Sequence, residues 1–121
     1  QGVFWGCNQA FAASVGLSSP KDIIGKTDYD LPTTKEESDA YRADDQAVMQ
    51  SNKAKINIEE TQTRKDGKKV TLLTSKVPLV SKDGSVVGIL CIYSDITELK
   101  NKICSTIYVR HRQGYGVCWM C

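Results

Sequence analysis

Cysteine is the residue whose spacing in this chain most directly suggests chemistry. There are five cysteines, and Cys118 and Cys121 form a Cys-x-x-Cys pair, the spacing of thiol redox pairs and of half a zinc site. A redox pair of this kind opens a helix and a zinc site needs a second pair of ligands, and neither context is present. On a strand, moreover, the two thiols would point to opposite faces. A thiol-redox or metal-sensing role is therefore the least favoured hypothesis, and Cys7 and Cys91 are interpreted as core residues in a reducing cytosol.

The remaining polar residues do not form a catalytic set. His111 is the only histidine, so no Ser-His-Asp arrangement can be assembled. Glu59 and Glu60 are adjacent on an expected strand, and their carboxylates therefore point to opposite faces. The sequence also lacks a Gly-rich phosphate loop and a His/Cys/Asp metal cluster. It predicts a regulatory domain rather than an enzyme, and any kinase or cyclase activity would belong to the parent protein.

Residues 56–99 carry the clearest structural signal, which is a run of three strands joined by Asp-Gly turns. Gly67 and Gly84 supply the positive φ that such turns require. The expected strands are Ile56–Arg64, Lys69–Val80 and Ser85–Ser94. An Asp-Ile-Thr sequence follows the third strand. The pattern predicts a three-stranded antiparallel meander.

The N-terminal half is expected to hold one short strand and three helices. Val3–Trp5 is β-prone, and Asn8 is a good N-cap for a helix over Gln9–Val15. Ser19-Pro20-Lys21-Asp22 opens a second short helix. Thr34 and Glu37 form a capping box for a longer helix over Lys35–Gln50. Its narrow apolar stripe is expected to consist of Ala40, Ala43, Ala47 and Val48.

This order of elements resembles that of PAS domains (S-box sensory domains with a PAC motif), found in many bacterial signal-transduction proteins. The resemblance covers about residues 2–100 and lacks only the usual first strand. The pieces that carry it are Gly2, Asn8-Gln9-Ala10-Phe11, Ile24-Gly25-Lys26, the two Asp-Gly turns, Pro78-Leu79, Gly88 and Asp95-Ile96-Thr97. It implies an α+β fold, with an antiparallel sheet of about five strands and short helices on one face. It also implies a sensory or relay role, for example in a histidine kinase of a two-component system.

The resemblance can be tested against the cofactors that PAS domains bind. Haem-binding members use a histidine in the helical region, whereas His111 lies in the tail. Flavin-binding members carry a reactive cysteine where this chain has Asp28, and they have amide side chains where it has Leu72 and Leu90. We therefore expect no haem or flavin, and no visible absorption band from the purified protein. An unknown small ligand is the remaining possibility.

A ligand pocket in a PAS domain lies between the inner face of the sheet and the short helices. Period-2 alternation places a set of residues on one face of the meander, taken as the inner face: Leu72, Thr74, Gly88, Leu90 and Ile92. The pocket candidates are Gln62, Leu72, Thr74, Leu90 and Tyr29, and Asp28 and Asp30 could also reach the pocket from the helical side. A filled core without a ligand predicts the same apolar residues.

Asp95, Ile96 and Thr97 are the candidate signal-relay residues. In PAS proteins this motif marks the junction between the last strand and the output helix. Asp95 or Thr97 can cap that helix, and the Asp95 carboxylate can pair with a base such as Lys76. The alternative is a helix cap without a signalling role.

The tail, residues 101–121, is treated separately from the PAS domain of residues 1–100. Its Gly116–Cys121 segment repeats four of the six residues of Gly2–Cys7. The tail either completes the sheet or begins a second PAS repeat. In the first case we expect Ile103–Val109 to take the vacant first-strand position, paired within one chain or between two chains.

Charge and hydropathy limit the kinds of partner that the sequence predicts. The 16 Lys and Arg residues include three beyond residue 100, so residues 1–100 carry 13 bases against all 14 acids, a net charge of −1. We therefore expect no nucleic-acid partner. Because no run reaches the ~18 apolar residues of a membrane helix, we expect a cytoplasmic location without direct membrane contact, possible also within a membrane-anchored sensor.

The expected partners are a second copy of the chain and an effector domain of the same parent protein. The alternative to a sensory function is a ligand-free dimerisation module. In that module the exposed sheet face would pack on another copy, with Val70, Leu73 and Val87 as candidates.

Overall fold

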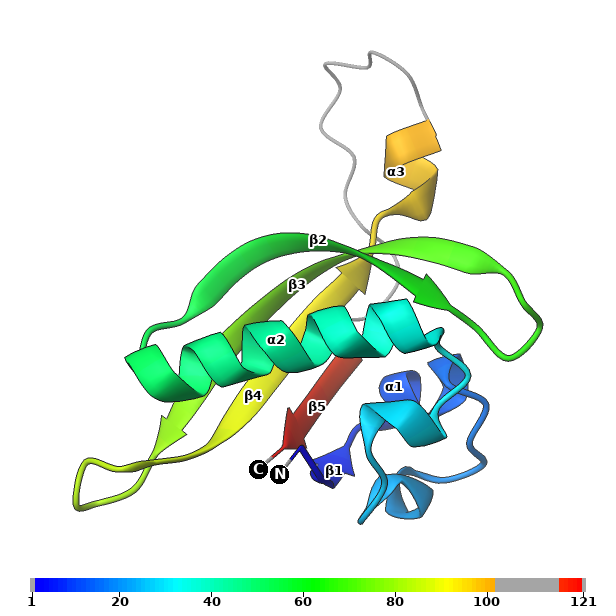
Figure 1. Ribbon diagram of the computed structural model, residues 1–121. Helices are drawn as coiled ribbons and strands as arrows, with labels where there is room; N and C mark the ends of the chain where they lie inside the picture. Colours follow the sequence, from blue (N-terminus) through cyan, green and yellow to red (C-terminus); the bar gives the residue numbers. More distant parts are fainter. Residues whose placement is uncertain (1, 102–115, 121) are drawn as a thin grey trace.

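The computed structural model describes residues 2–101 and 116–120. Its centre is an antiparallel sheet with the spatial order β1-β5-β4-β3-β2 (Figure 1). The strands are β1 (Phe4–Cys7), β2 (Lys55–Thr63), β3 (Lys69–Val80), β4 (Val86–Asp95) and β5 (Gly116–Met120). The helical elements are α1 (Gln9–Ser14), the 3-10 turns η1 (Pro20–Ile23) and η2 (Asp28–Asp30), α2 (Lys35–Ser51) and α3 (Thr97–Asn101). The expected α+β fold, an antiparallel sheet with a few helices, is confirmed.

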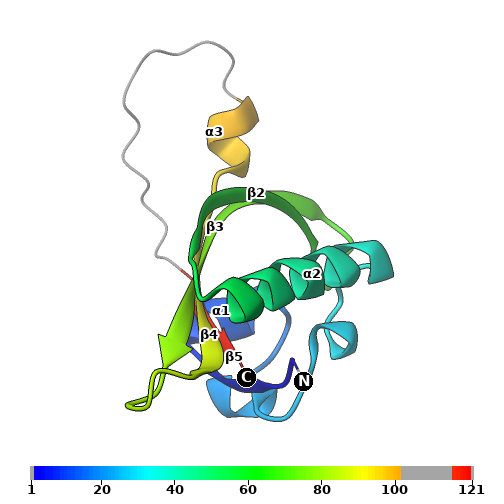
Figure 2. The same ribbon diagram turned by 60° about the vertical axis from the view of Figure 1, so that its left-hand side comes forward.

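The helices leave one broad face of the sheet uncovered. α2 crosses the other face, with α1 beside its N-terminal end, and Figure 2 shows that α3 projects beyond the sheet. The core between them contains Phe4, Phe11 and Tyr93, whose rings form a chain of contacts with centroid distances of 5.6 and 6.0 Å. No helix among the described residues is both long and apolar enough to cross a membrane.

The helix starts follow the capping signals. Asn8 Oδ1 accepts a hydrogen bond from the Phe11 backbone N–H at 3.0 Å. Thr34 and Glu37 form a complete capping box at the start of α2, and Ser19 and Asp22 form one at η1. Both side chains of each box satisfy backbone donors that a helix start leaves free.

The turns between the three long strands also follow the sequence. Gly67 and Gly84 have φ of +83° and +89°, and no atom lies within 4 Å of the place where a Cβ would stand on either residue. Glycine is therefore required at these two positions because of the backbone conformation alone, and not because of a lack of space for a side chain.

Replacing Gly67 or Gly84 by Val should lower the free energy of unfolding by about 1–3 kcal/mol, because a β-branched residue is strained at positive φ. Gly84→Asn is the control, since asparagine tolerates left-handed backbone better and should lose less. Urea denaturation of the variants measures the loss. Equal stability of wild type and both Val variants would contradict the assignment of the hairpins.

The strand beside β4 differs from the predicted one. β5 lies between β4 and β1, with Cys118 opposite both Cys91 and Cys7. The position that we expected Ile103–Val109 to take is thus held by Gly116–Met120, and residues 103–109 lie outside the described part of the chain. Both segments have strand-forming residues, so propensity alone could not choose between them.

The face of β4 that points inward also differs. Leu72 and Thr74 are buried on the inner face, but they lie opposite Asp95 and Tyr93, and Leu90 points to the other side. The cause is a register shift between Leu79 and Val80 near the second turn. Extrapolation from the turn without this shift places Leu90 inside, because a one-residue slip moves every side chain to the opposite face. The inward residues of β4 are Ile89, Cys91 and Tyr93.

Candidate functional site: a pocket between the sheet and the helices

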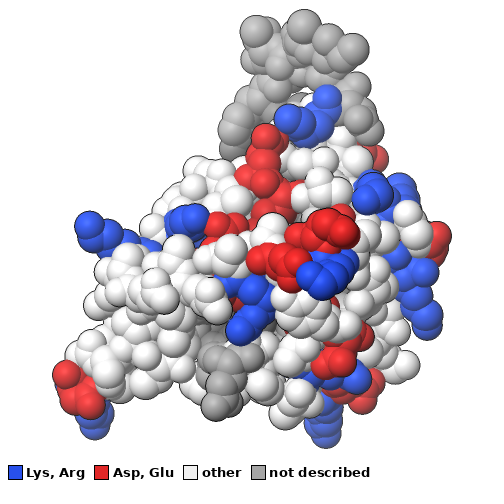
Figure 3. All heavy atoms as spheres, viewed as in Figure 1, with Lys and Arg blue, Asp and Glu red and all other residues white. Residues whose placement is uncertain are grey.

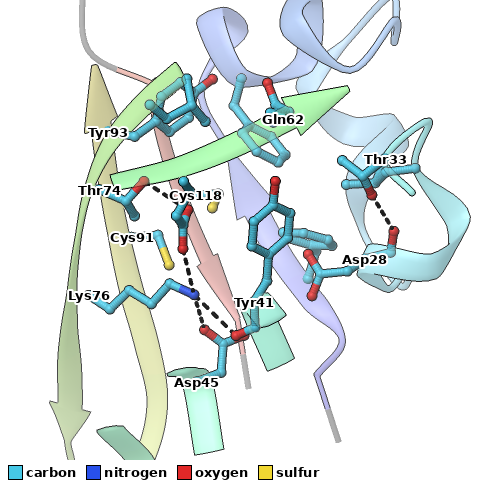
Figure 4. Close-up of a pocket in the computed structure, with 15 residues that line it drawn as sticks. Asp28, Thr33, Tyr41, Asp45, Gln62, Thr74, Lys76, Cys91, Tyr93 and Cys118 are labelled. Atoms are coloured by element: carbon cyan, nitrogen blue, oxygen red, sulfur yellow. Dashed lines mark hydrogen bonds and ion pairs between the residues drawn. The ribbon is translucent and has the colours of Figure 1, made fainter. Parts of the chain in front are cut away.

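A small cavity lies between the inner face of the sheet and the helical layer (Figure 4). Its volume is about 50 Å³. Fifteen residues line it: Phe4, Phe11, Asp28, Leu31, Thr33, Tyr41, Asp45, Glu60, Gln62, Leu72, Thr74, Lys76, Cys91, Tyr93 and Cys118. β1, α1, η2, α2 and all four remaining strands contribute to this wall, which is apolar at one end and charged at the other.

Three of the five pocket candidates line this cavity, namely Gln62, Leu72 and Thr74. Leu90 does not, because the register shift places it on the opposite face of β4. Tyr29 does not either, since its side chain is 52% exposed and its hydroxyl donates to Asp39 Oδ1 at 2.6 Å. Neighbouring residues of η2 point in different directions, so Asp28 is buried while Tyr29 faces solvent.

Lys76 is the centre of the charged end and is only 3% exposed. Its Nζ lies 2.9 Å from Asp45 Oδ1 and 3.6 Å from Glu60 Oε1, and it donates to the Tyr41 backbone carbonyl at 3.1 Å. Burial alone would lower the pKa of Lys76, but the two carboxylates outweigh it and the pKa lies above its ordinary value. The expected pair of Lys76 with Asp95 is thus wrong, because Lys76 points inward beneath α2.

Glu60 joins β2 to this cluster. Thr74 Oγ1 donates to Glu60 Oε2 at 2.9 Å. Burial raises the pKa of Glu60, and Lys76 offsets part of that rise. As predicted for adjacent strand residues, Glu59 points away and pairs with Lys100 at 3.0 Å.

Asp28 is a buried polar residue of the wall with an unsatisfied oxygen. It is 5% exposed, and its Oδ2 is buried without a hydrogen-bond partner among the described residues. Burial, followed by the Asp45 charge, raises the pKa of Asp28 to about 7, although Lys76 and Arg42 act in the opposite direction. Its carboxyl group therefore changes charge close to neutral pH.

Two thiols and the rings of Phe4, Phe11 and Tyr93 also line the cavity. A hydrogen bond with Cys91, together with burial, raises the pKa of Cys118. The Tyr93 hydroxyl is bonded to Ser14 Oγ at 3.0 Å. The Cys-x-x-Cys hypothesis concerns Cys121, which lies outside the described residues, and the residues opposite Cys118 on the neighbouring strands are Cys7 and Cys91. In the described part of the chain no group of three or more His, Cys, Asp or Glu residues could hold a metal.

A second hollow, of about 300 Å³, lies on the surface between α2 and β2. Figure 3 shows acidic side chains on this side of the molecule, with basic ones among them. The acids of this hollow mostly have partners already, since Glu37 accepts from Thr63, and Asp44 pairs with Lys55 at 2.7 Å. This hollow is therefore a weaker candidate than the buried cavity.

The relay residues form a compact junction at the end of β4. Arg64 Nη2 lies 3.1 Å from Asp95 Oδ2, and the Thr97 backbone N–H donates to Asp95 Oδ1 at 2.9 Å. Thr97 Oγ1 accepts from the Thr71 N–H at 2.9 Å, and the Ile96 N–H donates to the Thr71 carbonyl at 2.9 Å. Asp95 thus holds the first turn of α3, as one of the two expected capping arrangements requires, and Thr71 ties that turn to β3.

The solved structures similar to this chain include three of VqmA. They are VqmA bound to DPO (24% identity, TM-score 0.70), the Vibrio cholerae VqmA dimer without target DNA (23%, 0.74) and a Vibrio cholerae VqmA–ligand–DNA complex (22%, 0.71). In the same order, the matched regions cover 78%, 94% and 90% of this chain but only 47%, 50% and 52% of the VqmA chains. The chain therefore spans about half the length of these proteins, and the likeness concerns the fold.

These structures correct one expectation. The net charge of residues 1–100 was taken to exclude a nucleic-acid partner, but VqmA contains this fold and forms a DNA complex. The charge of one domain says nothing about a neighbouring domain that binds DNA, so that exclusion is wrong.

Two further comparisons concern the sequence itself. No curated protein matches the chain. A family model described as PAS fold matches residues 1–101, which make up most of this chain. With the sheet, the helical layer and the Asp-Ile-Thr junction described above, this match shows that the chain belongs to the PAS fold family.

Proposed function

We propose that this chain is a sensory domain that binds a small molecule in the buried cavity. Binding changes the Asp95–Thr97 junction, which thereby responds to whether the cavity is occupied. The observation that carries the proposal is the position of β3. Leu72 lines the cavity, and Thr71, the residue before it, binds Ile96 and Thr97. A ligand that displaces β3 would therefore change the support of α3.

The role proposed is regulatory rather than catalytic. A population shift between two arrangements of the junction would bias an effector of the parent protein. That effector could be a histidine kinase or a cyclase. A DNA-binding effector is equally compatible, since VqmA, whose chain this one matches over about half its length, binds target DNA.

Screening small molecules of fewer than about ten non-hydrogen atoms by protein-observed NMR would test the sensory function. We expect binders that shift the amides of Leu72 and Thr74 and also those of Ile96 and Thr97. Cys91→Leu, which fills the cavity, should abolish this binding, whereas Ile92→Leu on the outer face should not. Binders that leave Ile96 and Thr97 unchanged, or that bind Cys91→Leu equally well, would contradict the proposal.

A ligand-free dimerisation module is the second candidate. It is favoured by the uncovered face of the sheet, where Trp5, Val87 and Ile92 are 44%, 43% and 37% exposed. Of the residues expected on this face, Val70 is instead buried on the inner face, so it cannot contribute to such a contact. Sedimentation of wild type and Trp5→Ser decides this point, because loss of a dimer in the variant would support the module.

A further inference from the structure

When Asp28 is ionised, the charged groups around the cavity are one positive charge short. The three acids are Asp28 from η2, Asp45 from α2 and Glu60 from β2. The two bases are Lys76 from β3 and Arg42 from α2. Lys76 is already engaged, because its Nζ donates to the Tyr41 carbonyl and forms ion pairs with Asp45 and Glu60. Among the residues that line the cavity, a negatively charged ligand would therefore meet carboxylates and a lysine that is already engaged with them.

The unpartnered atoms of the wall are acceptors. Within the described part of the chain, four buried oxygens of the wall have no hydrogen-bond partner: Asp28 Oδ2, Gln62 Oε1, Asp45 Oδ1 and Glu60 Oε1. The last two lie in ion pairs with Lys76, which leaves Asp28 and Gln62, on residues that are 5% and 4% exposed. A buried acceptor without a partner is costly, and a ligand that carries N–H donors would remove this cost. The aromatic and thiol groups opposite offer an apolar surface to the remainder of such a ligand.

On the basis of the proposed sensory function, we propose that the cavity binds a small organic cation with N–H donors, such as an amidinium or a protonated amine, which donates to Asp28 and Gln62. A buried water needs roughly 10–15 Å³ of such space, so the cavity of about 50 Å³ holds on the order of four non-hydrogen atoms. The ligand is therefore expected to be a compact molecule with few carbon atoms.

Acetamidinium, acetamide and acetate test this assignment, because they share one shape and differ in charge. Titrated into the full chain and followed by NMR, acetamidinium should bind at least tenfold more tightly than acetate, with acetamide between them. Binding of a cation favours the ionised form of Asp28, so acetamidinium affinity should be about tenfold weaker at pH 6 than at pH 8.

Two variants control for other sites. Asp28→Asn should lose at least tenfold in acetamidinium affinity and lose the pH dependence. Glu36→Gln, in the acidic surface hollow, should change neither, which separates the cavity from weak binding at that hollow. If Asp28→Asn does not fold, the three isosteric compounds on wild type decide alone.

Acetamidinium binding no tighter than that of acetate, or unchanged in folded Asp28→Asn, would overturn the assignment. Acetamide or acetate bound in the cavity in its place would overturn the cation class while leaving the sensory function standing. The sensory function fails separately, when cavity ligands of any charge leave Ile96 and Thr97 unchanged.

Discussion

Lys76→Met is expected to lower the free energy of unfolding by about 3–5 kcal/mol at pH 7, because it leaves buried carboxylates without their cation. The side chains of Asp45 and Glu60 are only 7% and 11% exposed, so water cannot replace the ammonium. Urea denaturation measures the loss. The deficit should shrink as the pH is lowered, because burial raises the pKa of Glu60 and its unpaired carboxylate then takes up a proton.

The matched control is Lys100→Met. Lys100 and Glu59 form an ion pair of similar length, but both side chains are 52% exposed, and the expected loss is below about 1 kcal/mol. Equal losses for the Lys76 and Lys100 variants would mean that the inner cluster is accessible to water, against the structure.

Asp28→Asn is expected to change the pH dependence of stability. The pKa of Asp28 is raised from 3.8 in the unfolded chain to about 7 in the fold. Between these values the folded state binds the proton more tightly, so the contribution of Asp28 to stability is present at low pH and is lost as pH rises through about 7. From pH 5 to pH 8 this loss amounts to about 2–3 kcal/mol.

The free energy of unfolding of wild type should therefore fall relative to Asp28→Asn by that amount between pH 5 and pH 8. Glu60 and the other titrating groups are common to both proteins, and the difference isolates Asp28. Parallel pH profiles of the two proteins would show that Asp28 titrates normally and that its surroundings are not as described.

Local signals in the sequence predicted much of the fold. Capping residues such as Asn8 and Thr34 act within a few positions, and turn glycines such as Gly67 act on their own backbone. These features depend little on distant residues, so the element order and the α+β class could be predicted.

The site required information that the sequence pattern does not carry. Leu90 was assigned to the wrong face because a single register shift reverses the count along β4. Of the apolar stripe expected on α2, only Val48 is buried, and the other buried residues of the helix are Ser38 and Asp45. Asp45 can be buried only because Lys76, thirty-one positions away, lies against it, and no periodicity indicates such a pair.

The role of Asp28 was only half visible. Its position was compared with that of a flavin-reactive cysteine, and a reach toward the cavity from the helical side was anticipated. Its near-neutral pKa, however, arises from burial together with charges on α2, β2 and β3. Only the folded arrangement brings these groups together.

The cavity and the Asp95–Thr97 junction are expected to be coupled through β3. The most direct measurement follows the backbone amides of Thr71, Ile96 and Thr97 by NMR from pH 5.5 to pH 8.5, in wild type and in Asp28→Asn. These amides should shift in wild type with a midpoint of about 7, which is the pKa of Asp28, and the shift should disappear in the variant. Amides at the junction that stay unchanged while Asp28 itself titrates would contradict the coupling.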